Sequence, residues 1–363
     1  MSARSAGPYT HAVSPTGKLA PHEFDRLIAP HLGASRGEVL LGPRPGVDAA
    51  VVRVGAGRVM ALTTDPLSLV PALGPERSGW LACHLIASDL WTTGIPPAFA
   101  SVNLNLPPDL SDEALAAFVR AMGEAWAGMG VAVVTGHTGR FDGCGLPIVG
   151  AATLVGLGDE SRYVGPAFVA DGDRVIVTKG CAIEATAIAA HLFPQRLAAV
   201  LDEDSLARAR AMIEQVSVVA DCRAAIAAGV RDGGVSMLHD ATEGGVAGAL
   251  VEAARACGRD LRVERAKIPV SPEARAACEA FGIDPWWAMS EGTLIAFARA
   301  ARADAVLAEL KSAGIAAADA GEVVHGSGIV WMTEADGKVT RIAETQPDPY
   351  WQAYARAVRE GWT

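Results

Sequence analysis

Two aspartates frame a short apolar hairpin near the start of the sequence, in the stretch DAAVVRVGAGRVMALTTD that runs from Asp48 to Asp65. The β-branched residues on both sides favour strands, and the two central glycines can adopt the positive φ of a tight turn. If the chain folds back at Ala56, positions whose numbers sum to about 112 face each other across the pair. Asp48 then faces Thr64, and the two carboxylates lie side by side.

Two carboxylates that close repel each other unless a positive group lies between them. A hard cation such as magnesium, carrying nucleotide phosphates, would meet that need. The alternative is that both acids are solvated strand ends paired with Arg44 or Arg77, because surface acids are common. This stretch alone leaves both interpretations open.

A third acid interrupts an apolar helix. The segment SGWLACHLIASDLWTTG is apolar on nearly every side, which predicts a buried helix from about Ser78 to Thr92 that contains Asp89. A buried acid needs a partner or a metal. The alternative is a bond to a nearby helix terminus or a basic side chain.

Two further segments could bind phosphate. VTGHTG reads as a buried strand entering a polar turn, whose Gly136, His137 and Thr138 could present backbone N–H groups to a phosphate, or form an ordinary turn. Lys179, in VTKGCAIEATAIAAH, could reach a phosphate or be a solvated lysine at a strand end.

The stretch HDATEGGV places a histidine and two acids before a helix. Asp240 and Glu243 make a capping box, and an apolar stripe follows up to Gly258. A helix start preceded by paired glycines can attract an anion. A capped amphipathic helix explains everything after the glycines, but it does not explain His239, which stays a candidate for acid–base chemistry.

Composition narrows the class of protein. The 363 residues are 50% hydrophobic with a net charge of −10, which indicates two domains and argues against nucleic-acid binding. The six cysteines include no CxxC pair, so the sequence does not indicate a zinc site. Scattered cysteines of this kind indicate a reducing compartment. No apolar run has the length of a membrane span, and the N-terminus has no secretory h-region. We expect a soluble, cytoplasmic protein.

Strands alternate with helices along the chain, which predicts an α/β (α+β) class. We expect a flexible leader (1–20), an N-terminal domain (21–160), a C-terminal domain (165–345) and a C-terminal tail (346–363). The main expected elements are a helix from His22 to Leu32, a helix from the N-cap Ser111 to about Gly128, and strands at AFASVNLNL, VAVVTG, LPIVGAATLVG and RVIVT.

Taken in order, the motifs resemble the aminoimidazole-ribonucleotide-synthetase-like (PurM-like) superfamily. It includes that purine enzyme, selenophosphate synthetase, thiamine-monophosphate kinase and the HypE-type carbamoyl dehydratase. GVDAAVV resembles GDDAAVV, LTTDPLSLVP resembles TTDxxVxxP, ASDLWTTGIPPAF resembles NDLxxMGAxPL, VVTGHTG stands at the GGDT turn, and SEGTLIAF resembles the late EGxL strand. The most specific match is LHDATEGGVAGALVEAA with HDPTRGGLATALNEIA. The resemblance covers about residues 40 to 330.

The resemblance implies an N-terminal domain that dimerises by joining sheets into a β-barrel, beside a C-terminal α/β sandwich domain. It implies ATP and Mg²⁺ as cofactors, a small-molecule substrate, a homodimer and, for the HypE type, a maturation-protein partner. The implied metal ligands are Asp48, Asp65 and Asp89. The implied nucleotide contacts are Gly46, Thr64, Gly136, His137, Thr138 and Lys179. The implied catalytic groups are His239 and Asp240.

Four substitutions depart from the superfamily pattern and put metal or phosphate handling in doubt: Val47 in GDD, His137 in the GGD/ET turn, and Ala241 and Glu243 for the Pro and Arg of HDPTRGG. The HypE type also carries its carbamoyl group on a terminal cysteine, whereas the last cysteine here is Cys278. Our main hypothesis is an ATP- and magnesium-dependent enzyme that activates an amide or carbonyl oxygen by phosphorylation. The alternatives are a small-molecule kinase of the thiamine-monophosphate type and a non-catalytic nucleotide-binding scaffold.

Overall fold

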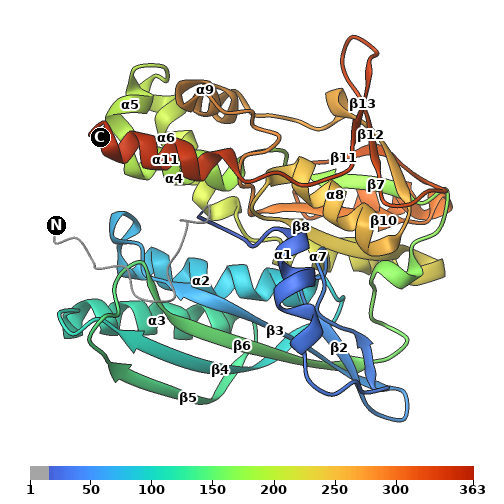
Figure 1. Cartoon of the computed structure of the whole chain (residues 1–363), viewed down its shortest axis with the longest axis horizontal. Helices are drawn as coiled ribbons and strands as arrows, with labels where there is room; N and C mark the ends of the chain where they lie inside the picture. The colour runs from blue at the N-terminus through green and yellow to red at the C-terminus, as the bar shows by residue number, and fades with distance from the viewer. Residues whose placement is uncertain (1–15) are drawn as a thin grey trace.

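The chain folds into two α/β halves, each built on one sheet (Figure 1). The computed structural model describes residues 16–363. The N-terminal sheet has six strands, ordered β1 (Val39–Leu41), β2 (Ala50–Gly55), β3 (Arg58–Ser68), β6 (Ile148–Asp159), β4 (Pro97–Leu106) and β5 (Ala132–Arg140). Helices α2 (Gly74–Trp91) and α3 (Asp112–Gly128) pack together on one face of it, and α1 (Pro21–Leu27) precedes it.

The predicted hairpin is confirmed in its register. Ala50 pairs with Leu62 and Val51 with Ala61, so the paired numbers sum to 112 as expected. Side chains alternate along β3, with Ala61 and Thr63 buried beneath the helices. Because a strand has a period of two, Asp65 shares the face of Thr63, and Thr64 lies on the opposite, open face of the sheet.

The segment 132–140 corrects a prediction. It is neither buried nor interrupted by a turn: β5 is one continuous strand that runs through His137, and almost all of its residues are exposed. The reason is its position, because β5 pairs in parallel with β4 and has no strand on its other side among residues 16–363. The sheet is therefore open in the single chain, and the implied dimeric barrel stays a prediction.

The C-terminal sheet has seven strands, with helices on both faces. Its order is β13 (Val339–Ile342), β12 (Val330–Thr333), β9 (Asp260–Glu264), β11 (Ala317–Val324), β7 (Arg174–Thr178), β10 (Thr293–Ala298) and β8 (Val235–Ala241). On one face, Val175 and Val177 share a core with α4 (Ile183–Leu192), α8 (Gly245–Cys257) and α9 (Pro272–Phe281). On the other, Ile176 packs with α7 (Val219–Ala227) and α10 (Ala303–Ser312).

The helices α5 (Pro194–Ala198), α6 (Glu203–Ala211) and α11 (Pro349–Arg359) complete this half. The predicted tail 346–363 is mostly α11, which packs against α4 and α9 through buried Tyr350 and through Tyr354, whose ring lies 5.9 Å from that of Phe193. The predicted N-cap at Ser111 is confirmed, since its side chain accepts the N–H of Ala114. None of the helices in residues 16–363 combines the length and apolar character needed to cross a bilayer.

Candidate functional site

The acids singled out in the sequence meet between the two halves. Asp48 precedes β2, Asp89 lies in α2, and Asp240 lies on β8, the edge strand of the C-terminal sheet. Thr63 links two of them: its Oγ1 donates to the main-chain oxygen of Asp48 at 3.0 Å and lies 3.3 Å from Asp89 Oδ2. Ligand atoms of Asp48, His239 and Asp240 all lie within 4.8 Å of one another. We call Asp48, Asp65, Asp89 and Asp240 the acidic cluster.

His239 is buried between two carboxylates. Its Nδ1 lies 2.8 Å from Asp48 Oδ2, and its Nε2 lies 3.3 Å from Glu252 Oε2. Burial alone would lower the pKa of His239, but Asp48 and Glu252 outweigh it and raise the pKa to about 10. The charged ring has a hydrogen bond to Asp48 at Nδ1 and an ion pair with Glu252 at Nε2, which makes no hydrogen bond within residues 16–363. This arrangement favours a positioning role over the predicted proton transfer.

The acidic cluster carries more negative charge than its surroundings neutralise. Burial raises the pKa of Asp65 to about 6. Burial, with the charge of Asp48, raises the pKa of Asp240 to about 8. The pKa of Asp89 is raised well above its usual value by burial and then by Asp240, Asp65 and Asp48. Only Asp48 has a lowered pKa, because His239 outweighs its burial. A cation among these oxygens would favour the ionised form of all four carboxyls.

The donor atoms fit a magnesium ion. Both carboxylate oxygens of Asp240 are buried and have no hydrogen-bond partner within residues 16–363, and the same holds for Oε2 of Glu291. Buried polar atoms without a partner are rare in folded proteins. Carboxylate oxygens are the ligands that Mg²⁺ prefers. A divalent cation would therefore satisfy oxygens that residues 16–363 leave unpaired.

The predicted nucleotide contacts are not gathered at one place. Gly46 has φ +79° and lies so close to the main-chain oxygen of Glu252 that a side chain would not fit, so it brings the loop before Asp48 against α8. Thr64 faces away from the cluster and donates to Ala152 O. Gly136, His137 and Thr138 lie on β5. Successive strand pairings connect Asp65 to Gly136 across the sheet, three strands away. At normal strand spacing the two residues are therefore about 14 Å apart.

Lys179 is committed elsewhere. Its Nζ donates to the main-chain oxygens of Gln215 and Ser217 at 3.1 and 2.9 Å and to Asp221 Oδ2 at 2.9 Å. An ammonium has three donors, so these contacts use all of them. Its side chain is only 13% exposed. The lysine is thus neither solvated nor directed at the cluster, and it stays only a predicted phosphate contact.

Sequence reasoning missed several charged residues here. Glu252 lies in the otherwise apolar α8 and is buried, a signal that could have been used, since buried acids need partners. Glu291, in the SEGTLIAF match, and Glu184 of α4 both have a pKa raised chiefly by burial, to about 8 for Glu184. Lys18 lies in the segment predicted as a flexible leader, of which residues 1–15 lie outside the described part. No local pattern marks it.

Comparison with known proteins finds one family domain in each half of the chain. Residues 46–157 match the N-terminal domain of AIR synthase related protein, and residues 170–332 match the C-terminal domain. A carbamoyl dehydratase HypE from Rhizobium leguminosarum bv. viciae is 30% identical over 289 residues, 77% of this chain and 78% of that protein. The chain belongs to the AIR synthase related family. The HypE of Escherichia coli K12 is also 30% identical, over 76% of this chain and 79% of its own.

Three solved structures share the fold of this AIR synthase related chain. A HypE–HypF complex aligns with a TM-score of 0.69 at 22% identity, over 89% of this chain and 99% of that one. A HypE in complex with ATP aligns with a TM-score of 0.62 at 22% identity, over 92% of this chain and 94% of that one. AaThiL complexed with AMPPCP and TMP aligns with a TM-score of 0.64 at 21% identity, over 83% of this chain and 90% of that one. At these identities the likeness concerns the fold.

Proposed function

We propose that the protein is an ATP- and Mg²⁺-dependent enzyme that activates an amide or carbonyl oxygen of a small-molecule or carrier-bound substrate by phosphorylation. The observation that carries the proposal is the acidic cluster, whose Asp240 has two buried oxygens with no hydrogen-bond partner among residues 16–363. The HypE relatives, named carbamoyl dehydratases, and the fold shared with an ATP complex support it.

In this mechanism Asp48, Asp65, Asp89 and Asp240 would hold the metal. Bound Mg²⁺ supplies charge neutralisation for the phosphate oxygens. His239 keeps Asp48 ionised and fixed in place, because its Nδ1–H donates to Asp48 Oδ2. The buried walls of the two domains limit water around the cluster, so charges act more strongly there than in solvent. Positioning and charge compensation are then the main contributions of the protein to phosphoryl transfer.

A kinase of the thiamine-monophosphate type is the second candidate, and the observation in its favour is the state of Cys278. This thiol is buried in α9, and its burial raises its pKa to about 12. It is thus poorly suited to carry a transferred group. A kinase needs no carrier thiol, because the phosphoryl group goes directly to a free acceptor. The products distinguish the two candidate enzymes. A kinase yields a phosphorylated acceptor, whereas the oxygen-activating enzyme yields free phosphate and a dehydrated acceptor.

The proposal is tested by thermal unfolding with ATP, with and without Mg²⁺. A ligand at a hundred times its dissociation constant adds about 2.7 kcal/mol to the unfolding free energy. We expect a magnesium-dependent rise in Tm with ATP, a smaller one with GTP, and loss of the rise in Asp65→Ala. No rise with any nucleotide would refute the enzyme hypotheses that need ATP and leave a scaffold, for which a maturation protein is the partner class to examine.

We also propose a homodimer formed through the open face and free edge of the N-terminal sheet. Val134 is 61% exposed on β5, and Phe99 and Leu157 lie exposed on neighbouring strands. An exposed apolar edge strand pairs readily with another chain. Light scattering should therefore give twice the 37.4 kDa chain mass, and Val134→Lys should give a monomer with native circular dichroism. A wild-type monomer at micromolar concentration would contradict this surface as a stable interface.

A further inference from the structure

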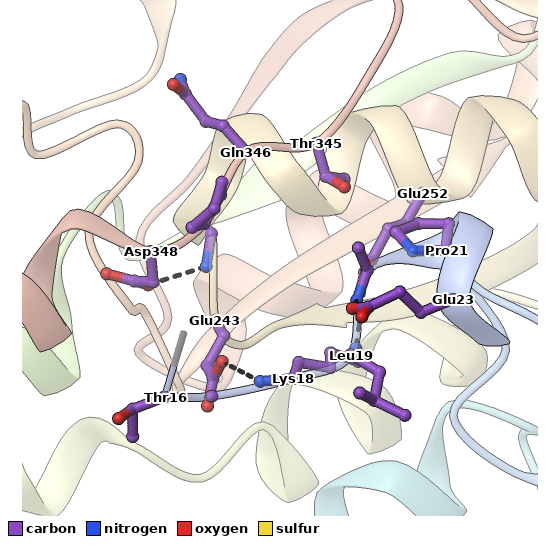
Figure 2. A pocket seen from close by; sticks show the side chains of 14 residues that line it. Thr16, Lys18, Leu19, Pro21, Glu23, Glu243, Glu252, Thr345, Gln346 and Asp348 are labelled. Atoms are coloured by element: carbon purple, nitrogen blue, oxygen red, sulfur yellow. Dashed lines mark hydrogen bonds and ion pairs between the residues drawn. The ribbon is translucent and has the colours of Figure 1, made fainter. Parts of the chain in front are cut away.

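The N-terminal segment enters the site instead of lying loose beside it. The main-chain N–H of Lys18 donates to Glu243 Oε2 at 2.6 Å (Figure 2). Gly17 has φ +117°, a conformation that glycine favours, and the Glu243 carboxylate lies against it. Glu243 stands directly before α8, after the strand that carries His239 and Asp240. This contact holds Gly17 and Lys18 against the loop that joins β8, the strand of His239 and Asp240, to α8.

The segment brings one ammonium to Glu252, the acid that also faces His239. Lys18 Nζ lies 3.6 Å from Glu252 Oε1, an ion pair too long to be a hydrogen bond. Within residues 16–363 the three donors of this ammonium make no hydrogen bond, and the side chain is 52% exposed. Partial burial alone would lower the pKa of Lys18, but the carboxylates, with Glu252 first, outweigh it and raise the pKa. The ammonium is therefore charged and lies in the field of the cluster.

Lys18 and Lys179 differ in what they can still bind. The donors of Lys179 are all used by protein oxygens, as described above. Lys18 lines a pocket of about 110 Å³, in which it is the one basic residue among the described lining residues (Figure 2). Four acids also line it: Glu23, Glu243, Glu252 and Asp348. A cation with free donors beside a carboxylate metal site is the arrangement that binds metal-bound phosphate, because the metal and the ammonium share its negative charge.

We propose that Lys18 is a phosphate-binding residue of this site and that Glu243 is its positioning residue. The inference rests on the proposed function, since it takes the ligand to be a magnesium-bound polyphosphate. The inference also explains why the residue at position 243 differs from the superfamily motif. A glutamate there replaces the arginine of the superfamily motif, and through its contact with the main chain of Lys18 it brings a lysine from the N-terminal segment to the same loop.

The test compares Lys18→Met, Lys18→Arg and the matched control Lys311→Met, which removes an exposed lysine on α10. Binding of ATP, adenosine and tripolyphosphate is measured by calorimetry with Mg²⁺. We expect Lys18→Met to weaken ATP and tripolyphosphate binding about 10- to 100-fold, which corresponds to the usual strength of charge-assisted hydrogen bonds, and to leave adenosine binding unchanged. Lys18→Arg should recover most of the loss, and Lys311→Met should match wild type.

Glu243→Gln separates positioning from folding. If Glu243 acts through Lys18, the substitution raises KM for ATP with little change in kcat, and it adds nothing to the loss in Lys18→Met. ATP affinity within about twofold of wild type in Lys18→Met would overturn the inference while leaving the proposed function intact, with Lys18 a counter-ion of Glu252. A wild-type protein that binds tripolyphosphate through Lys18 but does not bind ATP would uphold the inference and overturn the function. Binding of neither would overturn both.

Discussion

Asp89→Asn should strongly reduce turnover while leaving the metal-free protein as stable as wild type, or more stable. Asp89 belongs to the acidic cluster, and a neutral amide cannot replace a carboxylate that neutralises a metal. We expect a loss of about 10²- to 10³-fold in kcat, similar to the removal of one strong electrostatic contact at other active sites. Yet the Asp89 carboxyl has a strongly raised pKa from burial and from Asp240, so without metal its charge destabilises the fold. The amide of the Asp89→Asn variant would keep the contact with Thr63 and remove that repulsion.

The pH dependence distinguishes this explanation from general damage. A carboxyl whose pKa is higher in the folded than in the unfolded state holds its proton longer in the folded state, so the unfolding free energy falls as pH rises between the two values. Because both carboxyls start from 3.8 and rise to about 6 in Asp65 and about 8 in Asp240, the pKa shifts predict that the metal-free protein loses stability between pH 3.8 and about pH 8. Mg²⁺ should reduce the loss. Asp89→Asn should flatten this slope.

Urea unfolding at three pH values, with EDTA or with Mg²⁺, measures both effects. Asp109→Asn is the matched control, since Asp109 is an exposed acid of the same domain, and it should leave activity and slope unchanged. A metal-free Asp89→Asn protein that is less stable than wild type by more than about 1 kcal/mol would show that Asp89 is a structural acid and not a strained ligand.

The sequence predicted the local geometry of the site well because that geometry depends on short-range rules. The hairpin register followed from turn glycines and strand periodicity, and the burial of Asp89 followed from the apolar helix around it. The edge position of β5 could not be predicted in this way. VAVVTG has the apolar run of a buried strand, and whether such a strand lies in the middle or at the edge of a sheet is decided by pairing between distant segments.

The charge partners of the site were out of reach for the same reason. Lys18 and Glu243 are 225 positions apart, and Asp48 and His239 are 191 apart. No pattern within a window of the sequence links such residues. Lys179 was singled out because it follows a strand and precedes a helix, but its ammonium is taken up by Asp221 and two carbonyls on a segment that packs against it only in the fold. A residue type at a promising position therefore says little until its partners are known.

His239→Ala should be the most destabilising single substitution at the site. His239 is 1% exposed, and its removal would leave Asp48 and Glu252 buried without their shared counter-charge. Breaking one side of a buried ion pair costs about 3–5 kcal/mol. The double variant Asp48→Asn/His239→Gln should be less destabilised than His239→Ala, since neutralising the partner removes the uncompensated charge. His325→Ala, at a side chain that is 93% exposed, is the control and should change stability by less than about 0.5 kcal/mol.

The sign of the pH effect makes this prediction specific to charge. A histidine whose pKa rises on folding contributes its full stabilisation below the unfolded value of 6.5 and loses it as the pH rises through the folded value of about 10. The gap in unfolding free energy between wild type and His239→Gln should therefore narrow steadily from about pH 6.5 to pH 9. A constant gap over this range would mean that His239 acts by packing and neutral hydrogen bonds. The imidazolium would then not be what holds Asp48 in its ionised form beside the metal site.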